Sequence, residues 1–246
     1  MKKLFILIIG MAMLQTVSAQ ELKAVKYTDG AQELNGLVTS NAGKNLPGVL
    51  ILPAWMGIDD EAKTAALDLE KQGYIAFVAD IYGKGNIPTD FASASKMAGQ
   101  FKTDYALYQK RISLALDELK KAGAQSKVAV IGYCFGGTGA LETARAGFDV
   151  AGVISIHGGL SKAADRANVP IKTKVLVENP AEDKSVTKEA YEQLVQEMRD
   201  SKADWQIITY ANCGHTFTNP TSKEYNEVMA KRAWNHTLLF LAEVLK

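Results

Sequence analysis

A cysteine in a glycine-rich turn is the residue of this chain best placed to do chemistry. Cys134 lies at the centre of residues 132–137, GYCFGG, which have the form G-x-C-x-G. The run 127–131 before it is typical of a buried strand, and residues 138–145 after it are typical of a helix. Glycines on both sides permit a strained turn with close strand–helix packing. The pattern indicates a nucleophilic thiol at a strand–helix junction, where the helix N-terminus favours negative charge.

An acid and a histidine follow the cysteine in the chain. One predicted strand leads to a turn that ends in Glu182 and Asp183, and the next leads to a loop that carries His215. Because the carboxyl ends of parallel strands share one edge of a sheet, we expect these side chains to meet Cys134 there. Cys134 would be the nucleophile, His215 the base, and Asp183 the acid that orients the histidine. Glu182 competes with Asp183 for the last role.

The periodicity of apolar residues predicts one α/β domain. Two short β-like runs, 22–28 and 31–39, flank the turn signal Asp29-Gly30. Strands and helices then alternate: the predicted strands are 48–53, 74–79, 127–131, 150–156, 174–177 and 204–210, and the predicted helices are 59–72, 93–122 (in one piece or two), 138–145, 187–201 and 224–245. This order implies a mostly parallel, doubly wound sheet with helices on both faces and an antiparallel N-terminal hairpin.

The first residues indicate export. A basic start at residues 1–3, an apolar run at 4–14 and small residues at 17–19 predict a secretory signal peptide over 1–19, cleaved near Ala19-Gln20. The apolar run is shorter than the ~20 residues that span a membrane, so we expect no anchor in the mature form. The expected location is secreted or periplasmic, and the expected domain covers 20–246.

The charge of the mature chain argues for a small-molecule substrate. Residues 20–246 carry 26 basic and 27 acidic side chains, and this balance is unlike that of a nucleic-acid-binding protein. Nothing in the sequence decides between a monomer and a dimer.

The only two cysteines permit a second interpretation. Cys213 precedes His215 by two residues, so the fold would bring it near Cys134. The two thiols could form a bridge, and the protein would then be a thiol redox or ligand-binding protein on the same scaffold. A free nucleophilic thiol with Cys213 as a buried neighbour is the other alternative.

An acyl-transfer site also needs two backbone N–H groups for the oxyanion. We expect one at Phe135, directly after the nucleophile, and the other at Ala54 or Trp55, in the loop after strand 48–53. Trp55 and Met56 would also supply an apolar wall, and His157, in the turn His157-Gly158-Gly159, would line the pocket without taking part in catalysis. This chemistry calls for no metal and no cofactor.

With these residues, the chain resembles the dienelactone hydrolase family of the α/β-hydrolase superfamily. The resemblance rests on residues 132–137, on 73–74 leading to ADIYG at 79–83, on Asp183, and on GHTF at 214–217. It implies a hydrolase of carboxylic ester, lactone or thioester bonds that forms an acyl-enzyme on a Cys134-His215-Asp183 triad. The implied substrate contacts are Trp55, Met56, Tyr82, Lys84, His157 and Phe217.

Two departures from the family pattern bear on the substrate. Where family members that open dienelactones have a Glu on the first oxyanion loop, this chain has Ala54. Where they hold the substrate carboxylate with two arginines, it has Thr218-Asn219-Pro220 and Lys84, and a lysine lacks the bidentate fork of arginine. The resemblance therefore implies the triad without the apparatus specific to dienelactones.

Overall fold

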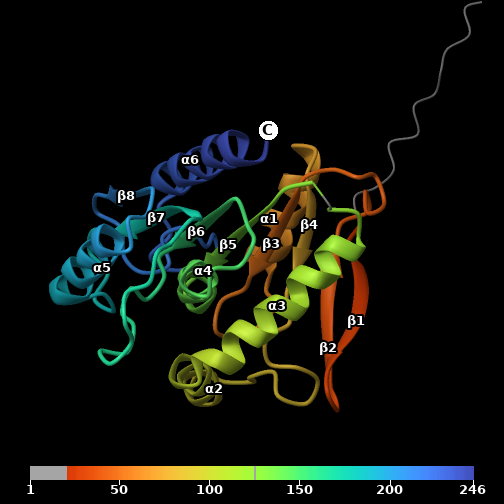
Figure 1. The fold of residues 1–246 in the computed structure, drawn as a ribbon, viewed down its shortest axis with the longest axis horizontal. Helices are drawn as coiled ribbons and strands as arrows, with labels where there is room; N and C mark the ends of the chain where they lie inside the picture. The colour runs from red at the N-terminus through yellow and green to blue at the C-terminus, as the bar shows by residue number, and fades with distance from the viewer. Residues whose placement is uncertain (1–20, 125) are drawn as a thin grey trace, which may run out of the picture.

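The computed structural model describes residues 21–124 and 126–246. Their strands form one eight-stranded sheet (Figure 1). The predicted signal peptide, 1–19, lies outside the described residues. The spatial order of the strands is β1-β2-β4-β3-β5-β6-β7-β8. Their bounds are β1 Lys23–Asp29, β2 Gln32–Val38, β3 Gly48–Leu52, β4 Ile75–Val78, β5 Val128–Tyr133, β6 Gly152–Ile156, β7 Lys174–Pro180 and β8 Trp205–Tyr210.

Strand directions follow the predicted pattern. The β1–β2 hairpin is antiparallel and turns at Gly30, whose φ of 58° suits glycine. Strand β2 also runs antiparallel to β4, and every pairing from β4 to β8 is parallel. A mostly parallel sheet with an antiparallel N-terminal hairpin is thus confirmed.

Helices cover both faces of the sheet. Successive side chains of a strand point to opposite faces, and both faces carry apolar side chains that pack against helices. Val49 and Ile51 of β3 pack with α1 and α6, while Leu50 and Leu52 pack with α2, α3 and α4. The helix bounds are α1 Asp60–Lys71, α2 Phe91–Thr103, α3 Tyr105–Lys121, α4 Phe135–Arg145, α5 Lys188–Asp200 and α6 Glu227–Leu245. Over the described ranges, no helix has both the length and the apolar character that crossing a membrane requires.

The long helical region after β4 is divided at Asp104. This residue ends α2, and its side chain accepts the N–H of Leu107 to begin α3. An N-cap aspartate satisfies an otherwise unpaired helix N–H, so the chain changes direction there at little cost. Of the two predicted possibilities, one long helix or two, the structure contains two.

Candidate active site

Cys134 lies in a strained turn between β5 and α4. Its φ is 52° and its ψ is −110°, a conformation that costs about 1–3 kcal/mol in a residue other than glycine. A Cβ on Gly136 would collide with the carbonyl of Leu52, and a Cβ on Gly132 would collide with Gly136. The glycines therefore let the turn pack against β3, and the turn leaves Cys134 half-buried at the carboxyl end of the sheet.

The cysteine, the histidine and the aspartate meet at this edge. Nε2 of His215 lies 3.0 Å from Sγ of Cys134, and Nδ1 lies 2.7 Å from Oδ2 of Asp183. Oδ1 of Asp183 accepts the N–H and the hydroxyl of Ser185, at 2.8 and 2.7 Å. Glu182 is exposed. Asp183 is thus the acid that reaches the imidazole, and Ser185 fixes its orientation.

Hydrogen bonding makes the imidazole hold its proton tightly. Burial alone would lower the pKa of His215, but the bonds to Asp183 and Cys134 raise this pKa to about 10. Burial also opposes ionisation of Asp183, yet the bonds from His215 and Ser185 lower the pKa of its carboxyl. At neutral pH an imidazolium therefore lies between a carboxylate and the sulfur, where it can give its proton to a leaving group.

Two backbone N–H groups predicted to form the oxyanion hole have no acceptor among the described residues. Within 21–124 and 126–246, no residue accepts a hydrogen bond from the N–H of Phe135 or of Trp55. The carbonyl of Phe135 accepts the hydroxyl of Tyr108, and that of Trp55 accepts the hydroxyl of Tyr82, each at 2.9 Å. The ring of Tyr108 also stacks on Phe135 with centroids 4.5 Å apart. Two tyrosines therefore fix the backbone of the residues predicted to form the oxyanion hole.

The amide of Cys134 begins a hydrogen-bond chain that leads away from the triad. Its N–H donates to Nδ1 of His157 at 3.1 Å as well as to a strand carbonyl. Nε2 of His157 lies 2.9 Å from Oγ1 of Thr218, and Thr218 donates to Oε1 of Glu61 at 2.7 Å. Because Nδ1 accepts, Nε2 carries the hydrogen and donates to Thr218. A neutral histidine of one tautomer thus links the nucleophile to α1.

Burial keeps this second histidine neutral. His157 is 2% exposed, and burial, together with the charge of His215, lowers its pKa to about 3. The two imidazole rings meet at 65° with centroids 5.2 Å apart, so His157 also supports His215. At the far end of the chain, burial raises the pKa of Glu61 to about 7. This carboxyl therefore titrates near neutrality.

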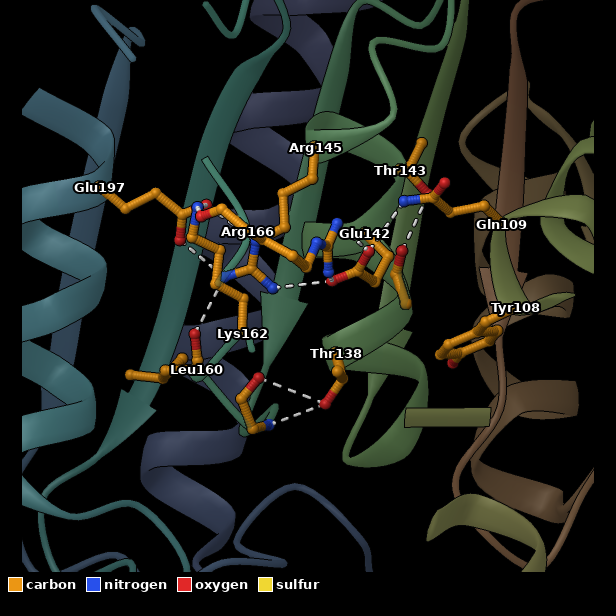
Figure 2. Close-up of polar contacts among 12 residues, drawn as sticks. Tyr108, Gln109, Thr138, Glu142, Thr143, Arg145, Leu160, Lys162, Arg166 and Glu197 are labelled. Atoms are coloured by element: carbon orange, nitrogen blue, oxygen red, sulfur yellow. Dashed lines mark hydrogen bonds and ion pairs between the residues drawn. The ribbon is translucent and has the colours of Figure 1, made fainter. Parts of the chain in front are cut away.

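Helix α4 rests on a buried ionic cluster. The ionic cluster comprises Glu142, Arg145, Lys162, Arg166 and Glu197 (Figure 2). Arg145 forms two bonds to Glu197, at 3.0 and 2.7 Å, and Arg166 forms two to Glu142, at 2.8 and 2.9 Å. Removing one partner of a buried pair costs about 3–5 kcal/mol. The cluster therefore ties the helix after Cys134 to the loop after β6 and to α5.

Three of the predicted substrate contacts lie at accessible positions. Trp55 and Met56 are half-buried in the loop after β3, and Trp55 stacks on the exposed Phe91 at a centroid distance of 5.7 Å. Lys84 is exposed, and its Nζ lies 3.5 Å from a carboxylate oxygen of Glu33 on the hairpin. Trp55 and Phe91 thus form an aromatic surface beside the oxyanion loop.

Two of the predicted substrate contacts, His157 and Phe217, have buried side chains. Both ring nitrogens of His157 are already bonded, and Phe217 is 0% exposed, stacked on Tyr210 at 5.1 Å. Tyr82 is 2% exposed and supports Trp55 from beneath the surface. The loop after β8 needs its own small apolar core to hold the histidine, and Phe217 supplies it.

Both cysteines are free. Cys213 is fully buried beside Tyr210 and Phe217, and its Sγ lies 3.5 Å from the carbonyl of Ala211. Burial raises the pKa of its thiol, which disfavours the reactive thiolate. In the part of the chain that the structure describes, no group of three or more His, Cys, Asp and Glu side chains is placed to hold a metal ion.

Sequence reasoning missed the residues that support the triad. The contact of Ser185 with Asp183 had a local sequence signal, since aspartate side chains commonly accept the backbone N–H of the residue two positions later. Tyr108 and Glu61 had none, because their partners lie 27 and 157 residues away along the chain.

The chain resembles known proteins over most of its length. Residues 34–245 match the model of the Dienelactone hydrolase family. The crystal structure of a dienelactone hydrolase-like promiscuous phosphotriesterase from metagenomic libraries is 33% identical, with a TM-score of 0.86, over 93% of this chain and 100% of that one.

Two curated relatives are more distant in sequence. One is "Probable 2-oxo-3-(5-oxofuran-2-ylidene)propanoate lactonase" of a Bradyrhizobium species, 26% identical over 87% of this chain and 90% of that protein. The other is carboxymethylenebutenolidase of Pseudomonas sp. strain P51, 25% identical over 79% of this chain and 84% of that protein. Together with the family match, these likenesses confirm the predicted α/β-hydrolase fold: the chain belongs to the dienelactone hydrolase family and is a hydrolase of the carboxylic ester type.

Proposed function

We propose that this chain is an exported hydrolase of carboxylic esters, lactones or thioesters that forms an acyl-enzyme on Cys134. One observation carries the proposal: His215 contacts Sγ of Cys134 at 3.0 Å through one nitrogen and Asp183 at 2.7 Å through the other. The names of the two curated relatives, a lactonase and a butenolidase, support a lactone among the substrates.

Acylation uses the imidazolium as an acid. The sulfur of Cys134 attacks the substrate carbonyl carbon, and the carbonyl oxygen becomes an oxyanion held by the N–H groups of Phe135 and Trp55. As this intermediate collapses, the carbon–oxygen bond breaks and His215 gives its proton to the departing alkoxide. An ester releases an alcohol at this point, whereas a lactone keeps its new hydroxyl within the acyl group. The product on the enzyme is a thioester.

Deacylation uses the same histidine as a base. Two of the interactions that raise the pKa of His215 come from Cys134, and acylation of the sulfur removes them. The imidazole, now neutral, takes a proton from water as the water attacks the thioester carbon. The carbon–sulfur bond then breaks, the carboxylic acid leaves, and sulfur and imidazolium are restored. The change in proton affinity lets one residue serve both steps.

We further propose an uncharged substrate. Ala54 provides no carboxylate on the oxyanion loop, and Lys84 pairs with Glu33. On the oxyanion loop, the half-buried Trp55 stacks on the exposed Phe91. These features suit an apolar acyl or alcohol group better than an anionic one.

Intact-protein mass spectrometry after brief mixing with 4-nitrophenyl acetate tests the proposal. The wild type should gain an acetyl group with a burst of nitrophenol and then lose it. Cys134→Ala should do neither, and Cys213→Ala, a matched change at a buried thiol, should behave like the wild type. Unchanged hydrolysis by a folded Cys134→Ala would refute the proposal. An unreactive protein with the mass of a disulfide form would instead favour the redox alternative.

Export has its own test. The full-length chain, expressed in a Gram-negative host, should appear in the periplasmic fraction with a mature N-terminus at Gln20. A cytoplasmic protein that retains residues 1–19 would contradict this part alone and leave the chemistry at Cys134 unaffected.

A further inference from the structure

A cavity lies on the face of the sheet covered by α1 and α6. Its volume is about 720 Å³, and its lining includes Tyr133, Ile156 and Glu178 at the ends of β5, β6 and β7. Cys134, Asp183 and His215 do not line it, whereas Thr218 does. The cavity is therefore a separate space that shares one residue with the hydrogen-bond chain from the nucleophile.

A buried carboxyl with an unused oxygen lines this cavity. Glu178 is 0% exposed, and its Oε1 accepts the hydroxyl of Thr237 at 3.0 Å. Its Oε2 has no hydrogen-bond partner among the residues that the structure describes. Buried polar atoms are nearly always paired, so an unpaired carboxyl oxygen in a cavity indicates a donor that arrives from outside the chain.

Other polar groups of the lining also lack a donor. Oε1 of Glu61 accepts the hydroxyl of Thr218, and over 21–124 and 126–246 nothing donates to its Oε2; the hydroxyl of Tyr133 likewise has no hydrogen-bond partner there. The acids at the rim, Asp60 and Asp68, pair with lysines of α1. Asp59, the other acid of the lining, caps α1 by accepting the N–H of Ala62, and the carboxyls of Glu61 and Glu178 remain. Burial raises the pKa of both, so a positively charged donor beside them would favour their ionised forms.

The apolar part of the lining suits an apolar body attached to that donor, and Lys231, the lysine of the lining, pairs with Glu227. Ile156, Tyr225 and Trp234 contribute aliphatic and aromatic surface, and aromatic faces also attract cations. The described residues offer no group of three metal-ligating side chains, so the donor set favours an organic cation over a metal ion. An ammonium group has three N–H donors, enough to bond both unpaired carboxyl oxygens.

We propose that the α1–α6 cavity binds an organic cation with an ammonium group on an aromatic or aliphatic body, the ammonium donating to Glu61 and Glu178. Binding reaches the active site because Glu61 ends the chain that runs through Thr218 and His157 to the amide of Cys134. The cation thereby modulates hydrolysis. This kinetic part rests on the proposed function, and the binding part does not.

Isothermal titration calorimetry with 2-phenylethylammonium chloride tests the binding, with the neutral 2-phenylethanol as a comparison. The wild type should bind one cation per chain and bind the alcohol at least about tenfold more weakly, the effect of losing a charge-assisted hydrogen bond. Glu178→Gln should weaken cation binding by a similar factor. Glu192→Gln, a matched change at an exposed carboxylate of α5, should have no effect.

Glu61→Gln serves as the second variant, and circular dichroism checks that each variant is folded. Equal affinity for cation and alcohol, or unchanged affinity in both folded cavity variants, overturns the proposal. For the kinetic part, saturating probe should change kcat for 4-nitrophenyl acetate by about fivefold or more. Thr218→Val, which cuts the chain, should abolish this change while the cation still binds. Binding without any change in kcat overturns the coupling alone, and an enzyme with no hydrolysis leaves the calorimetric result standing.

Discussion

His157→Gln should reverse the stability order of variant and wild type between neutral and acidic pH. In the folded protein His157 is neutral, with a pKa near 3, whereas the unfolded chain has the ordinary value near 6.5. As the pH falls below 6.5, the unfolded state binds a proton that the folded state refuses. The stability linked to this group is therefore fully present above pH 6.5 and is lost as the pH falls toward 3.

The size of the effect follows from the same values. Each pH unit within that window costs about 1.4 kcal/mol of unfolding free energy, so acidification to about pH 4.5 should cost the wild type roughly 2–3 kcal/mol through His157. Glutamine is neutral at every pH and keeps the donor to Thr218. It loses the acceptor for the amide of Cys134, which costs about 1 kcal/mol.

The two stability curves should therefore cross. At pH 7 the variant should be less stable than the wild type by about 1 kcal/mol, and at pH 4.5 more stable by a similar amount or more. Urea unfolding followed by circular dichroism over this range measures both curves. His236→Gln, a change at a half-buried histidine of α6 bonded to Tyr210, is the matched control. Parallel curves for His157→Gln and the wild type would refute the assignment of a neutral, bonded His157.

Three further changes probe the supports of the site. Tyr108→Phe removes the bond to the carbonyl of Phe135 and should lower both unfolding free energy, by about 1 kcal/mol, and kcat, with KM unchanged in steady-state assays. Ser185→Ala removes one of the two hydrogen bonds to Oδ1 of Asp183 and should lower kcat about tenfold; a wild-type rate would show that the carboxylate needs no such support. Gly136→Ala forces a methyl group into the carbonyl at the end of β3 and should yield no soluble, folded protein in expression trials.

The parts of the structure that local spacing determines could be predicted from the sequence. The glycines around Cys134 predict a strand–turn–helix, because few other residues fit that geometry. Asp183 and His215 follow predicted strands, and parallel strands bring their carboxyl ends to one edge. Alternating apolar runs predicted the sheet and its helices, and the N-terminal hairpin followed from a two-residue turn signal.

The supporting contacts could not be predicted, because they join residues far apart along the chain. Phe217 and His157 follow strands like the triad residues do, but which side chain turns inward depends on the packing of the loop after β8. The bond between Glu61 and Thr218 spans 157 residues. Periodicity alone does not decide whether the helix divides at Asp104, because an aspartate can lie within a helix or cap the start of a new one.

The ionic cluster beneath α4 bears on how the protein responds to its medium. Salt screens exposed charges within about 8 Å at 0.15 M ionic strength, but buried pairs much less. The attraction within surface pairs such as Lys63 and Asp60 weakens at high salt concentration. The attraction between Arg145 and Glu142, with side chains 3% and 5% exposed, is largely kept. The helix that presents Cys134 is therefore anchored by charges that dissolved ions screen only weakly, and we expect its geometry to change little with the salinity around the protein.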